Sequence, residues 1–152
     1  MSLSVQNDIR LLAPKFGLAV GHALNLCHRQ GLDVVVQESL RSNELQQHYY
    51  AQGRTRPGPI VTNAKSSLYS WHGYGLAVDV VSASRAWNTT AGWRDAVAGI
   101  FKSCGLAWGG DWAAKDLPHF QWGLCRPSPS NRARQLLAEG GLPAVWQEVR
   151  AV

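Results

Sequence analysis

Four side chains of the sequence have the types and spacing of a hydrolytic metal site. His72 and Asp79 lie seven residues apart, and Asp116 and His119 lie three residues apart further along the chain. A catalytic zinc takes three ligands from His, Asp or Glu, keeps a fourth position for water, and works with a nearby base that does not bind the metal. His72, Asp79 and His119 are therefore the candidate ligands, and Asp116 is the candidate base.

The chemistry of this donor set suits amide hydrolysis. Two neutral imidazoles and one carboxylate leave a bound zinc ion with a net charge of about +1, which keeps the ion strongly acidic toward water. The pKa of the bound water then falls toward roughly 7, so that hydroxide is available at physiological pH. Such a site favours attack on an amide carbonyl.

Two other interpretations compete for these residues. For an arbitrary His and Asp at this separation, a hydrogen-bonded structural pair is the commoner arrangement. A nucleophilic triad of Ser70, His72 and Asp79 is disfavoured, because its members lie too close in sequence to converge easily and no glycine-flanked turn surrounds the serine.

The residues around the candidate ligands indicate how they are positioned. Residues 75–82 alternate as a strand does, which places Asp79 on one face with Ala77 and Val81. Glycines at positions 73 and 75 allow a sharp turn between His72 and this strand. Pro118 favours an extended residue before it, so that the candidate base and His119 can both face the metal.

The remaining patterns predict an α+β fold in a single domain that spans residues 1–152, with a small, mainly antiparallel sheet packed with helices. The expected helices are a short one from about residue 4, a longer one over 14–30, and others over 42–52, 90–104, 129–139 and 143–149. The expected strands are 33–38, 75–82, 106–108 and 119–122, and 53–62 is an expected ordered loop.

Composition limits the possible partners. The sequence has 152 residues, a formal charge of +5 and a pI near 9.5, which favours an anionic partner such as nucleic acid, anionic lipid or bacterial cell wall. The basic residues are scattered and form no stripe, which disfavours nucleic acid. The N-terminus lacks the pattern of a secretory signal, and no apolar stretch is long enough to span a bilayer.

The other metal-binding residue types are expected to be structural. His22 and His28 lie six residues apart on one expected helix, and therefore point in different directions. Cys27, Cys104 and Cys125 are too widely spaced for a zinc knuckle and odd in number, so they are expected to be mainly buried thiols, although one pair could oxidise in an oxidising compartment.

The pattern Ser-x-His-x-x-Gly-x-Ala-x-Asp, followed by Asp-x-Pro-His, resembles the VanY-like D-Ala-D-Ala carboxypeptidase group of zinc peptidases, peptidase family M15. Within it the sequence is similar to the phage endolysins that are L-alanyl-D-glutamate endopeptidases. The resemblance runs from about residue 40 to residue 122, and it includes Arg41, Gln46 and the 53–62 loop.

The resemblance implies a family fold with one zinc ion in a central cleft, held by His72, Asp79 and His119. Asp116 would be the general base that takes a proton from water and passes it to the leaving amine. Arg41 would bind substrate and steady the carbonyl oxygen as it becomes an oxyanion. Ser70 would support the substrate or a ligand by hydrogen bonding.

Two features favour an endolysin within that family. The endolysins tend to carry Asp at the base position, where carboxypeptidases and dipeptidases often carry Glu. A short, basic chain without a signal or a separate wall-binding module also resembles an endolysin of a phage that infects a Gram-negative host. The pair before Arg41, Ser39 and Leu40, departs from the Gly and aromatic residue of many members.

We therefore expect a monomeric zinc peptidase that cuts the peptidoglycan stem peptide between L-Ala and D-Glu during phage-induced lysis. It would collect in the host cytoplasm, without membrane insertion, until a membrane lesion releases it to the wall. The alternatives are a D-Ala-D-Ala carboxypeptidase and, from another class, a non-catalytic wall-binding module that keeps zinc for structure.

Overall fold

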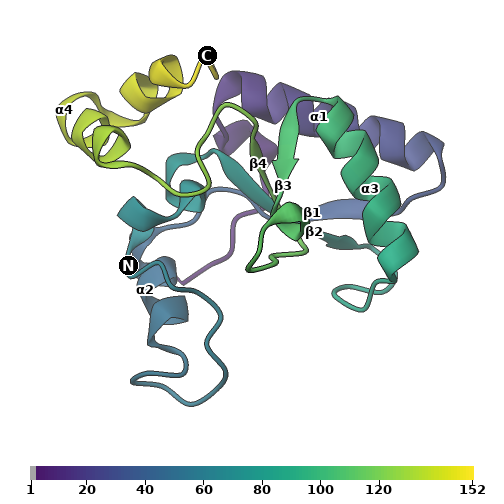
Figure 1. Cartoon of the computed structure of the whole chain (residues 1–152), viewed down its shortest axis with the longest axis horizontal. Coiled ribbons are helices and arrows are strands. Elements are labelled where there is room, and N and C mark those ends of the chain that lie inside the picture. Colours follow the sequence, from purple (N-terminus) through teal and green to yellow (C-terminus); the bar gives the residue numbers. More distant parts are fainter. Residues whose placement is uncertain (1–2) are drawn as a thin grey trace.

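The computed structural model describes residues 3–152, and its centre is one four-stranded antiparallel sheet (Figure 1). The strand order is β1 (Val34–Glu38), β2 (Ala77–Ser82), β4 (His119–Trp122) and β3 (Leu106–Trp108). The predicted α+β class and antiparallel sheet are confirmed. Residues 1–2, where the predicted domain and the N-terminal segment without a signal pattern begin, lie outside the described residues.

Two helices cover one face of the sheet. α1 (Pro14–Arg29) begins with a proline at its first position, and α3 (Ala91–Ser103) is capped by Thr90, whose hydroxyl accepts from the amide of Trp93 at 3.2 Å. Their apolar faces meet the sheet in a buried core that includes Phe16, Val20, Val78, Phe101 and Phe120. This layer leaves the opposite face of the sheet available for polar side chains.

α2 (Asn43–Ala51) and the loop that follows it extend from the sheet on the other side (Figure 1). Ser42 caps the helix through a bond from the amide of Leu45 at 3.1 Å. The loop is ordered as expected, because Arg54 donates to the carbonyls of Tyr50 and Thr62 and Arg56 donates to that of His48.

α4 (Asn131–Glu148) contains the expected interruption. Gly141 has φ 71° and ψ −168°, and Pro143 follows it, so the segment consists of two helical pieces joined at a kink. Trp146 donates from its indole to the carbonyl of Tyr74 at 2.7 Å, and Trp122 donates to that of Val149 at 2.6 Å. These bonds hold the C-terminal segment against the sheet.

The N-terminal segment differs from the prediction. Residues 3–8 are not helical, and the short helix is a single 3-10 turn, Ile9–Leu11, capped by Asp8. The carbonyl of Gln6 instead accepts from the amide of Ser39 at 2.7 Å and from its hydroxyl at 3.2 Å. The prediction of a helix from residue 4 was wrong, because the carbonyl of Gln6, which a helix would bond within itself, bonds to Ser39 instead.

Two further 3-10 helices, Ser67–Tyr69 and Trp71–Tyr74, precede β2, where the sequence indicated only a turn. A β-bulge also interrupts β1 between Val36 and Glu38, and it places Glu38 opposite Asp79. Because a bulge shifts the alternation of a strand, Glu38 lies on the polar face of the sheet with Asp79. None of the described helices is both long and apolar enough to cross a membrane.

Candidate metal centre

The structure brings His72, Asp79 and His119 together on the polar face of the sheet. Asp79 on β2 lies directly opposite His119 on β4, and His72 comes from the 3-10 helix Trp71–Tyr74. An oxygen of Asp79, Oδ1, lies 3.3 Å from Nε2 of His72 and 3.6 Å from Nδ1 of His119. One ligand atom from each residue falls within 4.8 Å of the others.

This spacing fits a tetrahedral metal. Zinc–nitrogen and zinc–oxygen bonds of about 2.0–2.2 Å place two ligand atoms of a tetrahedron roughly 3.3–3.6 Å apart. The two histidine–carboxylate distances, 3.3 and 3.6 Å, lie in that range. His72 and His119 are buried and Asp79 is nearly so, which gives a ligand set shielded from bulk water.

Backbone geometry fixes His72. Ser70 caps the 3-10 helix, and its hydroxyl accepts from the amide of His72 at 3.3 Å. Gly75 ends the helix at φ 67°, a left-handed conformation that favours glycine. The ring Nδ1 lies 3.2 Å from the carbonyl of Ser39, which can only accept, so Nδ1 carries a proton and Nε2 is the ring nitrogen that faces Asp79.

Gln121 fixes the ring of His119. Its amide nitrogen donates to the carbonyl of Arg126 at 2.9 Å, which leaves its oxygen facing Nε2 of His119 at 2.8 Å. Nε2 therefore carries a proton, and Nδ1 is the ring nitrogen that faces Asp79 and would bind a metal. The sequence interpretation missed Gln121, although a residue two positions beyond His119 on a strand must share its face.

Electrostatics keep Asp79 ionised. Burial alone would raise the pKa of its carboxyl, but the charges and hydrogen bonds of His72 and His119 hold that pKa well below its ordinary value. Burial by itself would lower the pKa of His119, but the hydrogen bond to Asp79 and the charges of Asp79 and Asp116 raise that pKa overall. The cluster thus holds an ionised carboxylate between two imidazoles, the donor set that a dication binds.

Arg41 lies beside the cluster, on the side of Asp79 away from the histidines. Its Nε donates to Glu38 at 2.8 Å, its Nη1 to Gln46 at 2.8 Å, and its Nη2 lies 3.5 Å from Oδ2 of Asp79. The guanidinium also stacks over the ring of Tyr49 at 4.9 Å. These partners fix a buried cation at the edge of the site, and the sequence interpretation did not include Glu38 among them.

Asp116 lies at the mouth of the site, with a side chain that is 49% exposed. Its Oδ2 is 3.7 Å from Nδ1 of His119. Partial burial raises the pKa of the carboxyl, while the charge of His119 opposes that rise. The carboxylate of Asp116 therefore lies near the three candidate ligands without belonging to their closely spaced set. A general base needs both properties, because it must reach the attacking water without binding the metal itself.

The loop that carries Asp116 depends on Gly109. The amide of Asp116 donates to the carbonyl of Gly109 at 3.0 Å, and a Cβ on Gly109 would lie 2.4 Å from the carbonyl oxygen of Asp116. Trp108 also donates from its indole to the carbonyl of Leu117 at 2.8 Å. The loop is therefore held at two points on either side of the acidic side chain.

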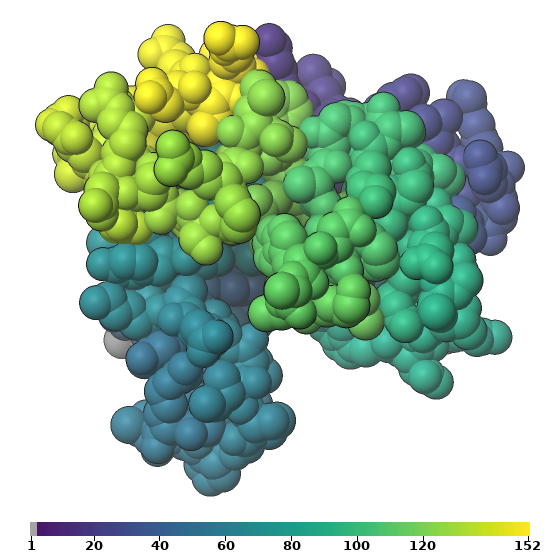
Figure 2. Space-filling view, in the orientation of Figure 1, coloured from purple at the N-terminus to yellow at the C-terminus, as the bar shows by residue number. Residues whose placement is uncertain are grey.

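These groups lie in a cleft of about 1100 Å³, which we call the metal cleft. Its rim combines exposed and partly exposed side chains, apolar and polar, from the loop after α2, the loop before β4 and the segment before α4, including Ile60, Val61, Lys65, Tyr69, Trp112 and Pro127. Figure 2 shows the hollow where these three segments meet. Its volume is large enough for several residues of an extended peptide.

The other candidate residues lie elsewhere or are structural. His22 and His28 are exposed on α1, and Nε2 of His28 lies 2.8 Å from the carbonyl of Val34. Cys27 is buried, Cys104 and Cys125 are partly buried, and all three are free thiols. Burial raises the pKa of Cys27 to about 11 and that of Cys125 to about 12, so neither is a reactive thiolate at neutral pH.

Comparisons with known proteins agree with this geometry. A D-alanyl-D-alanine carboxypeptidase family model of the M15 type matches residues 62–122, the segment that holds the candidate ligands and Asp116. The peptidoglycan L-alanyl-D-glutamate endopeptidase CwlK of Bacillus subtilis is 40% identical over 105 residues, which cover 60% of this chain and 62% of that protein. The chain thus spans about three fifths of the length of this curated relative.

Solved structures show the same fold at lower identity. The L-Ala D-Glu endopeptidase ChiX of Serratia marcescens matches with a TM-score of 0.60 and 24% identity, over 75% of this chain and 82% of that one. The vancomycin resistance D,D-pentapeptidase VanY, solved with Zn(II), matches with a TM-score of 0.53 and 16% identity, over 95% and 86%. The resemblance to peptidase family M15 is confirmed, and the chain has the fold of its solved members.

Proposed function

We propose that this chain is a zinc-dependent peptidase that hydrolyses the peptidoglycan stem peptide between L-Ala and D-Glu. The observation that carries the proposal is the convergence of two imidazoles and a carboxylate, with Asp116 beside them, at the base of a cleft of peptide dimensions. The activity named for the relative that is 40% identical supports the choice of substrate.

In this proposal His72, Asp79 and His119 would hold a zinc ion, which would supply Lewis acidity toward water and toward the amide carbonyl. Asp116 accepts the proton of the attacking water at its carboxylate and then passes that proton to the leaving amine. Its raised pKa brings the carboxyl closer to the operating pH, which favours both transfers.

Arg41 donates to the carbonyl oxygen of the substrate as negative charge develops on it. Its bonds to Glu38 and Gln46 keep the guanidinium in one place, so that little reorganisation is needed during the reaction. The hydroxyl of Ser70 supports the candidate ligand His72 by accepting from its backbone amide. Of the two roles expected for Ser70, this is support of a ligand rather than of the substrate.

We further propose that residues 1–152 form one catalytic domain that acts as a monomeric phage endolysin. Asp rather than Glu at position 116 and the formal charge of +5 support that role. The protein would remain in the host cytoplasm until a membrane lesion admits it to the wall. Expression in a bacterial host should then cause lysis only when the inner membrane is permeabilised.

A second candidate is D-Ala-D-Ala carboxypeptidase activity, which the description of the matching family model favours. Mass spectrometry of digested muropeptides separates the two. Our proposal predicts fragments with a new amino terminus at D-Glu, whereas the second candidate predicts loss of one terminal D-Ala. Neither product from zinc-loaded protein would leave a non-catalytic wall-binding module.

A further inference from the structure

One backbone carbonyl, that of Arg126, accepts two side-chain hydrogen bonds beside the candidate metal centre. The indole nitrogen of Trp71 donates to it at 2.7 Å, and the amide nitrogen of Gln121 donates to it at 2.9 Å. Trp71 directly precedes His72 in the chain, and Gln121 faces the ring of His119. The carbonyl of Arg126 therefore joins the two segments that carry the candidate histidine ligands.

Both donors hold this carbonyl in a fixed direction. A carbonyl oxygen has two lone pairs, and the two hydrogen bonds occupy both of them. Trp71 and Gln121 are buried, so water does not readily replace either donor. Pro127 follows Arg126, and a proline ring restricts the residue before it to extended backbone. The carbonyl of Arg126 is therefore a rigid acceptor.

The direction of the Gln121 side-chain amide depends on this acceptor. Because the carbonyl of Arg126 can only accept, it takes the amide nitrogen, and the amide oxygen is left facing Nε2 of His119 at 2.8 Å. A reversed amide would turn its own N–H groups toward Nε2. It would thereby favour a ring with its proton on Nδ1, the nitrogen that faces Asp79. The carbonyl of Arg126 thus acts on His119 through Gln121.

We infer that Trp71 is a positioning residue for His119. Its indole N–H holds the carbonyl of Arg126 against Gln121, so that the segment that carries one candidate histidine ligand also orients the ring of the other. The inference rests on the zinc binding in the proposed function. Position 126 lies beyond residues 62–122, which the family model matches, so the metal centre also depends on chain outside that match.

Zinc affinity tests this chain of contacts. Trp71→Phe removes the indole N–H and keeps an aromatic ring, and it should weaken zinc binding about three- to tenfold, the range of one net hydrogen bond. Competition with a chromogenic chelator measures the affinity. In a Gln121→Leu background the same substitution should change the affinity by less than about twofold, since Trp71 acts through Gln121. Wild-type affinity in Trp71→Phe, or its full effect in that background, would overturn the inference.

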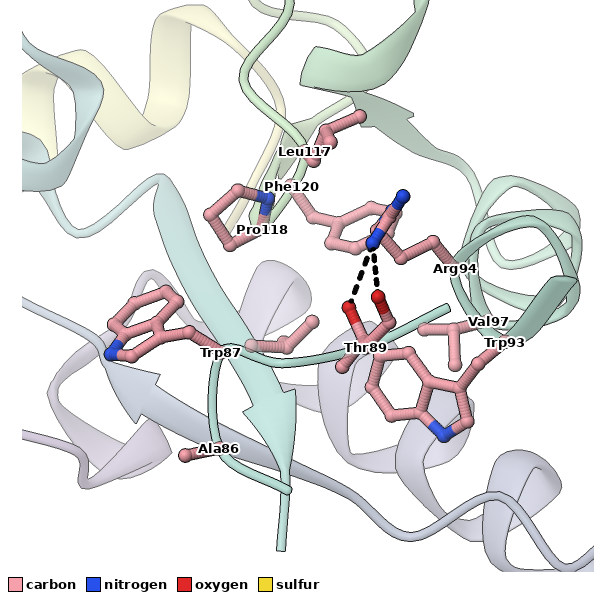
Figure 3. A pocket seen from close by; sticks show the side chains of 10 residues that line it. Ala86, Trp87, Thr89, Trp93, Arg94, Val97, Leu117, Pro118 and Phe120 are labelled. Carbon is pink, nitrogen blue, oxygen red and sulfur yellow. Dashed lines mark hydrogen bonds between the residues drawn. The ribbon is translucent and has the colours of Figure 1, made fainter. Parts of the chain in front are cut away.

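Two control variants separate positioning from a general loss of stability. Trp122→Phe removes another indole donor to the C-terminal segment, the one that bonds to the carbonyl of Val149. Val97→Ala enlarges a cavity of about 180 Å³ that Val97 and Phe120 line on the helix-covered face of the sheet (Figure 3). Both should lower the free energy of unfolding and leave zinc affinity as in wild type. Zinc affinity that falls in these controls as in Trp71→Phe would overturn the inference.

An NMR measurement keeps this test separate from the proposed function. The ring Nε2–H of His119 donates to Gln121, and its exchange with solvent can be followed in metal-free and in zinc-loaded protein. Exchange should be about tenfold faster in Trp71→Phe than in wild type, and unchanged in the two controls. If wild type binds no zinc, the proposed function fails, whereas equal exchange in metal-free wild type and Trp71→Phe would overturn the positioning inference by itself.

Discussion

Asp79 and His119 occupy directly opposed positions on β2 and β4, and Oδ1 of Asp79 lies 3.6 Å from Nδ1 of His119. Antiparallel pairing of β2 and β4 in this register thus places two of the three candidate ligands next to each other. A one-residue slip of β4 would turn His119 to the helix-covered face and bring Phe120 to the polar face. Core packing of Phe120 against Phe101, with ring centroids 4.4 Å apart, therefore also fixes the metal site.

Gln121→Leu should weaken zinc binding by about 10- to 100-fold, because His119 then loses the acceptor that selects its tautomer. Competition with a chromogenic chelator measures this affinity without any assay of activity. Gln135→Leu, on α4 and away from the site, is the control and should bind zinc as wild type does. Wild-type affinity in Gln121→Leu would show that the hydrogen bond does not support the ligand.

Gly109→Ala should impair catalysis and stability together, since the new Cβ would lie 2.4 Å from the carbonyl oxygen of Asp116. Relief of such a clash displaces backbone, at a cost of about 1–3 kcal/mol, and moves the proposed base. Gly99→Ala on α3 is the matched control, because no atom lies within 4 Å of its added Cβ, and it should stabilise by about 0.5–1 kcal/mol. Denaturant unfolding and peptide hydrolysis, measured on both variants, check the pair.

The carboxylate of Asp33 should make stability depend on pH at the acid end. Hydrogen bonds from Ser84, then from Ser82, hold its folded-state pKa below the unfolded value of about 3.9. A depressed folded pKa contributes stability above about pH 4, and that contribution is lost as pH falls toward the folded pKa.

Asp33→Asn should therefore lower Tm at pH 7, and the difference from wild type should shrink near pH 3. Asp95→Asn, at an exposed position on α3, is the control and should show no such convergence. A difference in Tm between Asp33→Asn and wild type that is the same at both pH values would contradict the assignment of this effect to the ionised carboxylate.

Salt should reduce activity on intact wall more than activity on a short peptide. The formal charge of +5 would hold the protein on an anionic surface, and exposed charges are screened beyond about 10 Å at 0.1 M salt. Release of soluble fragments from whole peptidoglycan should fall steadily as salt is raised from about 0.05 to about 0.5 M, because the Debye length shortens over that range. Equal dependence on salt for the short peptide would assign the effect to the site rather than to the surface.

Local sequence signals predicted most of the fold. Period-two alternation placed Asp79 on one face of β2, and the helical patterns over 42–52 and 90–104 predicted α2 and α3. The interruption at Gly141 followed from paired glycines and a proline. Each of these features depends on neighbouring residues along the chain, so periodicity and capping residues carry the information.

Features that depend on contacts between distant segments were not predicted. The bulge that turns Glu38 toward Arg41 depends on the register between β1 and β2. The carbonyl of Ser39 reaches the ring of His72 across 33 residues, and the composition of neither segment indicates that contact. The bond to His72 does not depend on the side chain at position 39, since the backbone carbonyl of Ser39 makes it.

The most direct test of the proposed zinc mechanism is a titration of metal-stripped protein with zinc, in which bound metal and hydrolysis of an L-Ala-D-Glu peptide are measured on the same samples. Activity should rise until about one zinc is bound per chain, as expected for a single three-ligand site. Asp116→Asn should bind the same amount of zinc and hydrolyse the peptide about 10²- to 10⁴-fold more slowly. Full activity without metal, or a zinc-loaded Asp116→Asn as fast as wild type, would contradict it.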